Sequence, residues 1–115
     1  MEPTTPQEQL ELADRYYYGE GIEFDLAKAV YWYGRAAEQG NAEAACLLGY
    51  CLREGIGTEK DPDRAFEMFE KSAQAGFPMA EYDMGICFEK GIGTAVDPEK
   101  AKYWFGKAAE DGYTE

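Results

Sequence analysis

A period of 36 residues dominates this sequence and constrains its fold more than any other feature. Residues 6–41, 42–77 and 78–113 align with one another without a gap. Six columns of this alignment are identical in all three units: Gly19/Gly55/Gly91, Gly21/Gly57/Gly93, Asp25/Asp61/Asp97, Ala29/Ala65/Ala101, Ala37/Ala73/Ala109 and Gly40/Gly76/Gly112. A period of this length is typical of repeat architectures. The sequence therefore predicts a single repeat domain over residues 1–115, built from three copies of one unit.

Each unit contains two apolar stretches with the spacing of a helix. In the second unit, Ala44, Leu48 and Leu52 recur every four residues, which places them on one helical face. A second face follows, made of Ala65, Met68, Phe69 and Ala73. The pattern predicts an all-α fold of six helices, each of roughly 11 to 15 residues, joined by short loops.

Turn and capping residues delimit these helices. Gly55 is expected to end the first helix of its unit, because glycine tolerates the left-handed backbone found at many helix C-termini. Asp61-Pro62 then starts the next helix, with Asp as the N-cap and Pro at the first helical position. Thr5 and Glu8 have the spacing of a capping box, and Asn41 is the expected cap of the third helix.

Two glycines fall inside predicted helices rather than at their ends. Gly49 and Gly85 occupy one column of the repeat, and Ala13 fills that column in the first unit. A mid-helix glycine costs about 1 kcal/mol relative to alanine, so we expect a neighbouring helix to pack directly on it. One unit cannot bury its apolar stripe alone, whereas three stacked units can.

The residues of the repeat also resemble a known family. The first unit reads Tyr16-x-x-Gly19-x-Gly21-Ile22-x-x-Asp25-x-x-Lys28-Ala29-x-x-Trp32-Tyr33-x-Arg35-Ala36-Ala37-x-Gln39-Gly40. This pattern is similar to the Sel-1-like repeat, a relative of the tetratricopeptide repeat, and the likeness covers nearly the whole chain. Leu52 and Phe88 stand where the family usually has Tyr, and Met68 where it has Trp. The resemblance implies a right-handed α/α superhelix, or solenoid, that serves as a protein-binding scaffold or adaptor.

The resemblance also implies where a partner would bind. Solenoids of this kind line their concave face with the first helix of each unit. Mapped onto this sequence, that face comprises Leu10, Asp14, Tyr17, Tyr18, Glu43, Cys46, Tyr50, Arg53, Met79, Tyr82, Ile86 and Glu89. This aromatic and apolar mixture suits a groove for an extended peptide or a helix. Two alternatives stay open: several of these residues only pack between repeats, or the chain is a structural segment that self-associates through its open solenoid ends.

The charge of the chain restricts its partners. There are 23 Asp and Glu against 11 Lys and Arg, a formal net charge of -12. Phosphate backbones and anionic membranes would be repelled, whereas a protein partner with basic residues is compatible with this surface. No apolar run approaches the roughly 20 residues that span a bilayer, so we expect no membrane insertion. The start of the chain lacks a signal peptide, which favours the cytoplasm, or a secreted or periplasmic location if a longer parent lost one.

Candidate chemistry in the sequence is sparse. Cys46, Cys51 and Cys87 lack paired Cys-x-x-Cys spacing and the chain has no His, which argues against structural zinc and favours reduced thiols in the core. The absence of His also removes the usual base for a Ser or Cys nucleophile. The Gly-x-Gly turns lack the third glycine of a dinucleotide site. We therefore predict no catalytic activity, no metal and no cofactor.

Overall fold

The computed structural model describes residues 2–113, which fold into helices without any strand. The helices, each of 13 residues, are α1 (Pro6–Tyr18), α2 (Leu26–Glu38), α3 (Ala42–Glu54), α4 (Pro62–Gln74), α5 (Pro78–Lys90) and α6 (Pro98–Glu110). Each repeat contributes two consecutive helices. The predicted all-α architecture of three helix–turn–helix units is therefore confirmed.

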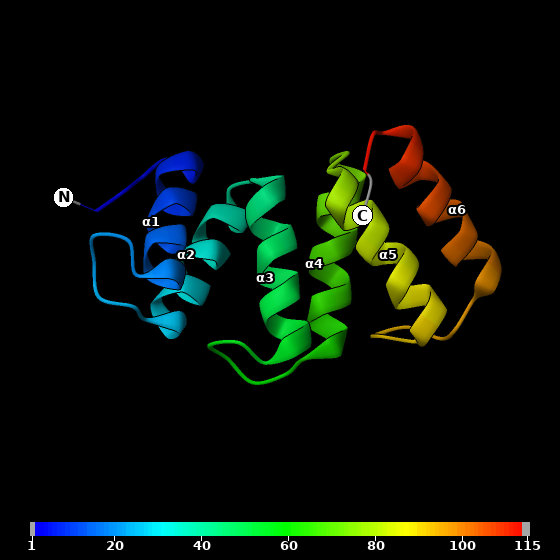
Figure 1. Ribbon diagram of the computed structural model, residues 1–115, viewed down its shortest axis with the longest axis horizontal. Helices are drawn as coiled ribbons and strands as arrows, with labels where there is room; N and C mark the ends of the chain where they lie inside the picture. Colours follow the sequence, from blue (N-terminus) through cyan, green and yellow to red (C-terminus); the bar gives the residue numbers. More distant parts are fainter. Residues whose placement is uncertain (1, 114–115) are drawn as a thin grey trace.

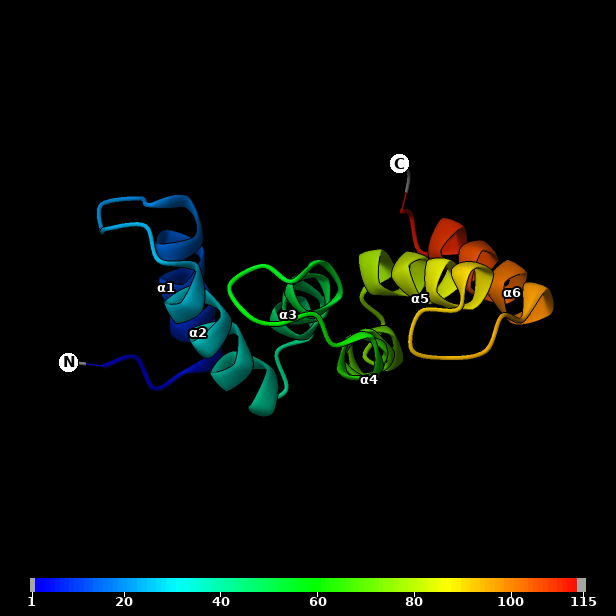
Figure 2. The same cartoon turned by 90° about the horizontal axis from the view of Figure 1, so that it is seen from below.

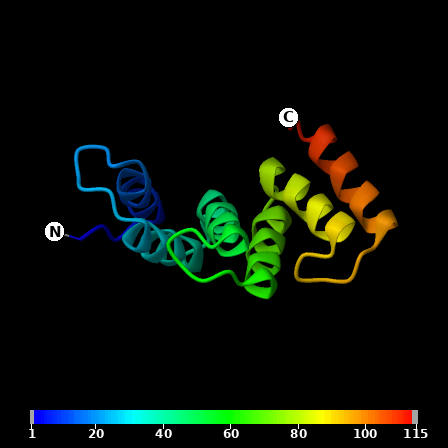
Figure 3. The same ribbon diagram turned by 60° about the horizontal axis from the view of Figure 1, so that its bottom comes forward.

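The three helix pairs follow one another along the long axis of an elongated molecule that measures 47 × 27 × 23 Å (Figure 1). Within each repeat the two helices pack against each other, and α2 and α4 also pack against the first helix of the following repeat. Seen from below, α4 lies on one side of α3 and α5, so the row of helices bends (Figure 2). The intermediate view shows the same order of pairs, with α1 and α6 in the two outer pairs (Figure 3).

Side-chain caps start most of the helices at the predicted residues. Thr5 and Glu8 form a complete capping box at α1. The Asn41 side chain accepts a hydrogen bond of 2.8 Å from the backbone N–H of Ala44 at α3. The repeated aspartates cap the second helices in the same way, as Asp61 does for the N–H of Arg64 at 3.1 Å. These bonds satisfy backbone donors that a helix cannot satisfy internally.

The first helix of every repeat ends at a glycine in the left-handed conformation. Gly19, Gly55 and Gly91 have φ values of 69°, 74° and 74°. The backbone N–H of each donates to the carbonyl oxygen four residues earlier. L-residues with a side chain rarely adopt this conformation, which explains why the column holds only glycine.

The mid-helix glycines allow close packing between the helices of one repeat. A Cβ atom built on Gly49 would lie 2.8 Å from the ring of Phe69, and one on Gly85 would lie 2.6 Å from the ring of Phe105. No real Cβ atom approaches a ring so closely, so each glycine creates the space that the aromatic side chain fills. The predicted direct contact of a neighbouring helix is therefore confirmed.

The three cysteines are part of the core. Cys46, Cys51 and Cys87 are buried free thiols. Burial raises the pKa of Cys51 to about 11 and that of Cys87 to about 12, because the thiolate is poorly solvated there. These thiols therefore stay protonated near neutral pH and act as small apolar side chains, as the sequence predicted.

Candidate functional site: a tyrosine-rich concave groove

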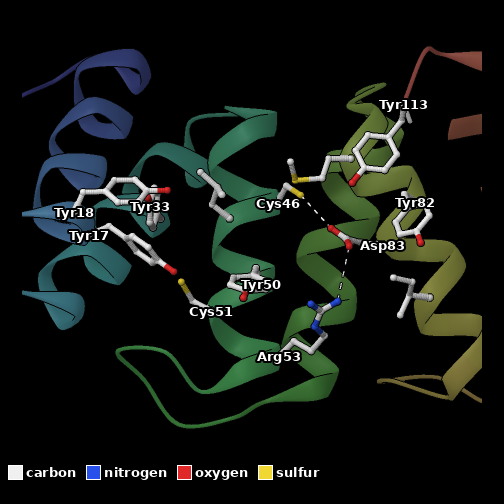
Figure 4. A pocket seen from close by; sticks show the side chains of 13 residues that line it. Tyr17, Tyr18, Tyr33, Cys46, Tyr50, Cys51, Arg53, Tyr82, Asp83 and Tyr113 are labelled. Atoms are coloured by element: carbon white, nitrogen blue, oxygen red, sulfur yellow. Dashed lines mark hydrogen bonds and ion pairs between the residues drawn. The ribbon is translucent and has the colours of Figure 1, made fainter. Parts of the chain in front are cut away.

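A hollow of about 380 Å³ runs across the middle of the row of helices (Figure 4). It is lined by residues of all three repeats: Tyr17, Tyr18, Tyr33, Cys46, Leu47, Tyr50, Cys51, Arg53, Met79, Tyr82, Asp83, Ile86 and Tyr113. Most of these residues lie on α1, α3 and α5, the first helices of their repeats. We call this hollow the concave groove.

Tyrosines dominate the surface of the concave groove. Tyr18 and Tyr50 are 67% and 40% exposed, so their rings are available to a ligand. The ring of Tyr17 packs edge-on against that of Tyr18, with 4.9 Å between their centroids. At the other end, the rings of Tyr82 and Tyr113 lie 5.1 Å apart. Such rings give large, rigid contact areas with a hydroxyl group at the edge, a combination that is common in binding surfaces.

Charged side chains form one cluster in the middle of the groove. The Arg53 guanidinium lies 3.8 Å from the Asp83 carboxylate and 2.9 Å from that of Glu54. The same guanidinium lies over the ring of Tyr50, 5.2 Å from its centroid. The Cys46 thiol donates a hydrogen bond of 3.4 Å to Asp83, as the dashed lines of Figure 4 show. This cluster links α3 to α5 and therefore crosses the boundary between two repeats.

The Asp83 carboxyl group is mostly buried, and this determines its acidity. Burial raises its pKa, whereas the thiol of Cys46 and the charge of Arg53 oppose that shift by favouring the carboxylate. Burial also raises the pKa of the Cys46 thiol, and the neighbouring Asp83 charge adds to the effect. The groove thus presents a compensated ion pair with a protonated thiol, rather than a reactive nucleophile.

A second polar contact lies beneath the groove in the first repeat. The Tyr33 hydroxyl donates a hydrogen bond of 2.6 Å to the carboxylate of Asp14. Tyr33 is almost completely buried, and burial followed by this bond to Asp14 raises the pKa of its phenol. The bond joins α1 to α2 and so helps to fix the position of α1, the helix that carries Tyr17.

The structure brings together most of the residues that the sequence assigned to the concave face. Those that line the groove are Tyr17, Tyr18, Cys46, Tyr50, Arg53, Met79, Tyr82 and Ile86. The other four lie elsewhere. Leu10 is buried in the core, and the Asp14 carboxylate accepts the hydrogen bond of the Tyr33 hydroxyl. Glu43 and Glu89 are exposed outside the groove, and Glu89 lines hollows beside α6 instead.

Other groove residues were missed by the sequence analysis. Tyr33 belongs to a column of core aromatics on the second helix, although it also reaches the groove from below. Asp83 and Leu47 occupy one column of the repeat, and the residue in that column differs in each unit. This variability is the sequence signal that could have identified them as groove residues. Tyr113 follows the end of α6 and reaches the groove only because the chain turns back toward Tyr82.

Other kinds of site find little support in the described part of the chain. Within residues 2–113, no group of three or more His, Cys, Asp or Glu side chains lies close enough to hold a metal ion. None of the helices formed by these residues is long and apolar enough to cross a membrane.

Stacked helical hairpins with a groove along their first helices define a helical-repeat protein of the α-solenoid class. The family model of the Sel1 repeat matches the chain three times, over residues 9–41, 42–77 and 78–113. The chain therefore belongs to the Sel1 repeat family. These matches follow the repeat boundaries at 42 and 78, which the 36-residue period had already indicated.

Solved structures of similar proteins agree with this assignment. A Sel1 repeat protein from Oxalobacter formigenes is 42% identical, with a TM-score of 0.86 over 94% of this chain and 81% of that one. The protective antigen c5321 of uropathogenic Escherichia coli, which has an SLR fold, is 34% identical with a TM-score of 0.92. That match covers 94% of this chain but only 23% of the antigen. The cysteine-rich protein B of Helicobacter pylori shares the fold at 18% identity, over 94% of this chain and 84% of that one, with a TM-score of 0.79.

A comparison with curated proteins found no match. Proteins built from Sel1 repeats are generally protein-interaction scaffolds, and the fold itself is non-catalytic. The family therefore gives the structural class of this chain. It does not identify the partner, which depends on the residues that differ between the repeats.

Proposed function

We propose that this chain is a scaffold that binds a segment of another protein in the concave groove, without catalysing a reaction. The observation that carries this proposal is the convergence of side chains from all three repeats on one hollow of about 380 Å³. A ligand in that hollow would contact α1, α3 and α5 together. Concave grooves of this kind commonly bind extended or helical peptides.

The exposed aromatic rings support the proposal. Tyr18 and Tyr50 project into the groove without being needed to fill the core, since both remain exposed. Met79 and Ile86 add apolar surface near the third repeat. Aromatic side chains surrounded by apolar ones are the groups that most often contribute large parts of a binding energy.

The charge of the chain supports a partner with basic residues. The net charge of -12 attracts a cationic segment over a long range and accelerates its association. Arg53 already compensates Asp83 inside the groove, so we expect the basic residues of the partner to contact the rim rather than the floor. Three free buried thiols are consistent with a reducing compartment, and we propose a cytoplasmic location on that ground.

Selection of binders from a random peptide library, followed by affinity measurements, tests this function. We expect Tyr18→Ala with Tyr50→Ala to weaken the selected peptides by about 2 kcal/mol or more, which is roughly 30-fold in Kd. The matched control is Tyr31→Ala with Tyr103→Ala, two exposed tyrosines outside the groove. Equal affinities for the groove variant and the unchanged chain would place the binding surface elsewhere.

The second candidate function is self-association through the ends of the solenoid. The observation that favours it is the exposure of Ala109 on the last helix, because Ala37 and Ala73 are buried at the equivalent positions. Within residues 2–113, no helix covers this side of α6 in the way that α3 and α5 cover the same side of α2 and α4.

A further inference from the structure

The middle of the concave groove holds an ion pair that the repeat replaces by apolar residues elsewhere. Arg53 on α3 and Asp83 on α5 lie 3.8 Å apart, across the boundary between the second and third repeats. One repeat earlier, the equivalent positions on α1 and α3 hold Tyr17 and Leu47, which also line the groove. The same boundary is thus built once with an aromatic and an aliphatic side chain and once with two charges. Helix packing alone therefore does not account for the charges.

The described residues do not fill the hydrogen-bonding capacity of either charged group. A guanidinium carries five N–H donors. Within residues 2–113, that of Arg53 donates one hydrogen bond, from Nε to Glu54 at 2.9 Å. The Asp83 carboxylate accepts one weak hydrogen bond, from the Cys46 thiol at 3.4 Å. Because the 3.8 Å between the two charged groups is longer than a hydrogen bond, donors of Arg53 and acceptor sites of Asp83 stay available to a ligand.

Both side chains are held in place on the floor of the groove. The Arg53 guanidinium lies over the rings of Tyr50 and Phe69, 5.2 and 5.8 Å from their centroids. The side chains of Arg53 and Asp83 are only 19% and 15% exposed. Figure 4 shows the pair in the middle of the side chains that line the hollow. A pair that is ordered before the ligand arrives loses little conformational entropy on binding.

The opposite signs of the two charges select a neutral polar ligand group. A cation placed near Asp83 would also lie near Arg53, and an anion placed near Arg53 would lie near Asp83 and Glu54. An apolar group would remove the pair from water and leave its donors and acceptors unsatisfied. A carboxamide has an acceptor and a donor on one planar group. Its oxygen can accept from Arg53 while its nitrogen donates to Asp83.

We propose that the concave groove recognises a glutamine or asparagine side chain of the partner segment, with its carboxamide group bound between Arg53 and Asp83. This inference rests on the proposed binding function and adds the chemistry of the residue at the centre of the groove. A Ser or Thr hydroxyl also donates and accepts, but its side chain is too short to reach the floor from a main chain at the rim. The positions of Tyr17 and Leu47 then take an apolar residue of the same segment.

Peptides selected from a random library test the inference from the side of the ligand. We expect the selected peptides to share a Gln or Asn at one position. Replacing that residue by Met, which has the length of Gln without its amide, should raise Kd at least about tenfold. Replacing it by Glu should have an effect of the same size, because the carboxylate would face Asp83. The same replacements at the other positions of the peptide serve as controls.

The repeat supplies a matched variant of the chain. Arg53→Tyr with Asp83→Leu gives this boundary the residues that the chain itself has one repeat earlier. The double variant should keep its helices, which circular dichroism checks, and should bind the Met peptide more tightly than the Gln or Asn peptide.

A single substitution tests the charge selection separately. Asp83→Asn leaves Arg53 without its partner across the groove, so the preference should move toward the Glu peptide. The control is Glu38→Gln, which removes an exposed ion pair with Arg35. It should leave the order of the affinities unchanged.

The outcomes separate this inference from the function on which it rests. Peptides that depend on Tyr18 and Tyr50 but share no Gln or Asn, or that tolerate Met there, would overturn the inference and leave the groove function intact. The same holds if Asp83→Asn and the double variant keep the order of affinities of the unchanged chain. Peptides that are insensitive to Tyr18→Ala with Tyr50→Ala would overturn the groove function, and the inference with it.

Discussion

Lys107 and Glu81 form an ion pair in which the ammonium group lies 3.9 Å from the carboxylate. The Glu81 side chain is completely buried. Within the described residues, neither oxygen of Glu81 has a hydrogen-bond partner. Burial raises the pKa of this carboxyl group, and the neighbouring Asp111 carboxyl group raises it further. The attraction of Lys107 opposes the shift without outweighing it.

The equivalent positions of the first repeat hold uncharged side chains. Gln9 stands in the column of Glu81 and Gln39 in that of Asp111, and the Gln39 amide donates a hydrogen bond of 2.6 Å to Gln9. The third repeat thus holds two carboxyl groups where the first has two amides. We therefore expect the stability of the last repeat to depend on the protonation of Glu81.

We expect Glu81→Gln to stabilise the protein at pH 7 by about 1 kcal/mol, or about 4 °C in Tm, because it removes a buried charge without a donor. The pKa of Glu81 is higher in the folded state than the 4.5 of the unfolded chain. The wild type therefore loses stability as the pH rises from 4.5 through the folded-state pKa. The advantage of the variant should therefore shrink toward pH 4.5. Thermal melts of both proteins across this range measure it, and a difference independent of pH would contradict the assignment.

Two mid-helix glycines should respond to the same substitution in opposite directions. Gly49→Ala gains about 1 kcal/mol of helix propensity but brings a Cβ atom to within 2.8 Å of the Phe69 ring, which is fully buried. Overpacking costs about 2 kcal/mol, so we expect a net loss of about 1 kcal/mol.

The matched control for Gly49 is Gly34→Ala on α2. Nothing lies within 4 Å of a Cβ atom at Gly34, so this variant should gain up to about 1 kcal/mol. Urea unfolding curves give both free energies. Equal signs for the two variants would mean that the ring of Phe69 does not restrict Gly49.

Removal of the groove cation should destabilise the contact between the second and third repeats. Arg53→Leu would leave the largely buried Asp83 without the 3.8 Å ion pair, at a cost of about 2 kcal/mol at pH 7. The loss should decrease as pH falls, because a protonated Asp83 no longer needs a cation. Arg35→Leu, which breaks an exposed pair of 4.0 Å with Glu38, should change the free energy of unfolding by less than about 0.5 kcal/mol.

Melts or urea titrations of these arginine variants decide the point. If Arg53→Leu with Asp83→Asn is as unstable as Arg53→Leu alone, the loss comes from the packing of Arg53 over Tyr50 and not from the unpaired carboxylate.

Local chemistry made the helices predictable from the sequence. Their boundaries depend on residues within one turn, such as the Thr5 cap and the left-handed Gly55, so a single chain segment contains the necessary information. The residues of the concave groove were predictable in part, because the family resemblance assigns the first helix of each repeat to the concave face. The same reasoning placed Leu10 in the groove, because Leu10 lies one helical turn before Asp14. In the structure the Leu10 side chain is buried in the core.

By itself, the sequence determined the number of repeats, the class of every element and the family, because a 36-residue period repeats short-range signals three times. The tertiary structure decided which variable residues meet. Asp83 pairs with Arg53 across a repeat boundary, and Tyr113 returns to Tyr82 after the last helix. These contacts depend on how the helices pack and bend relative to one another, and no local pattern encodes that geometry.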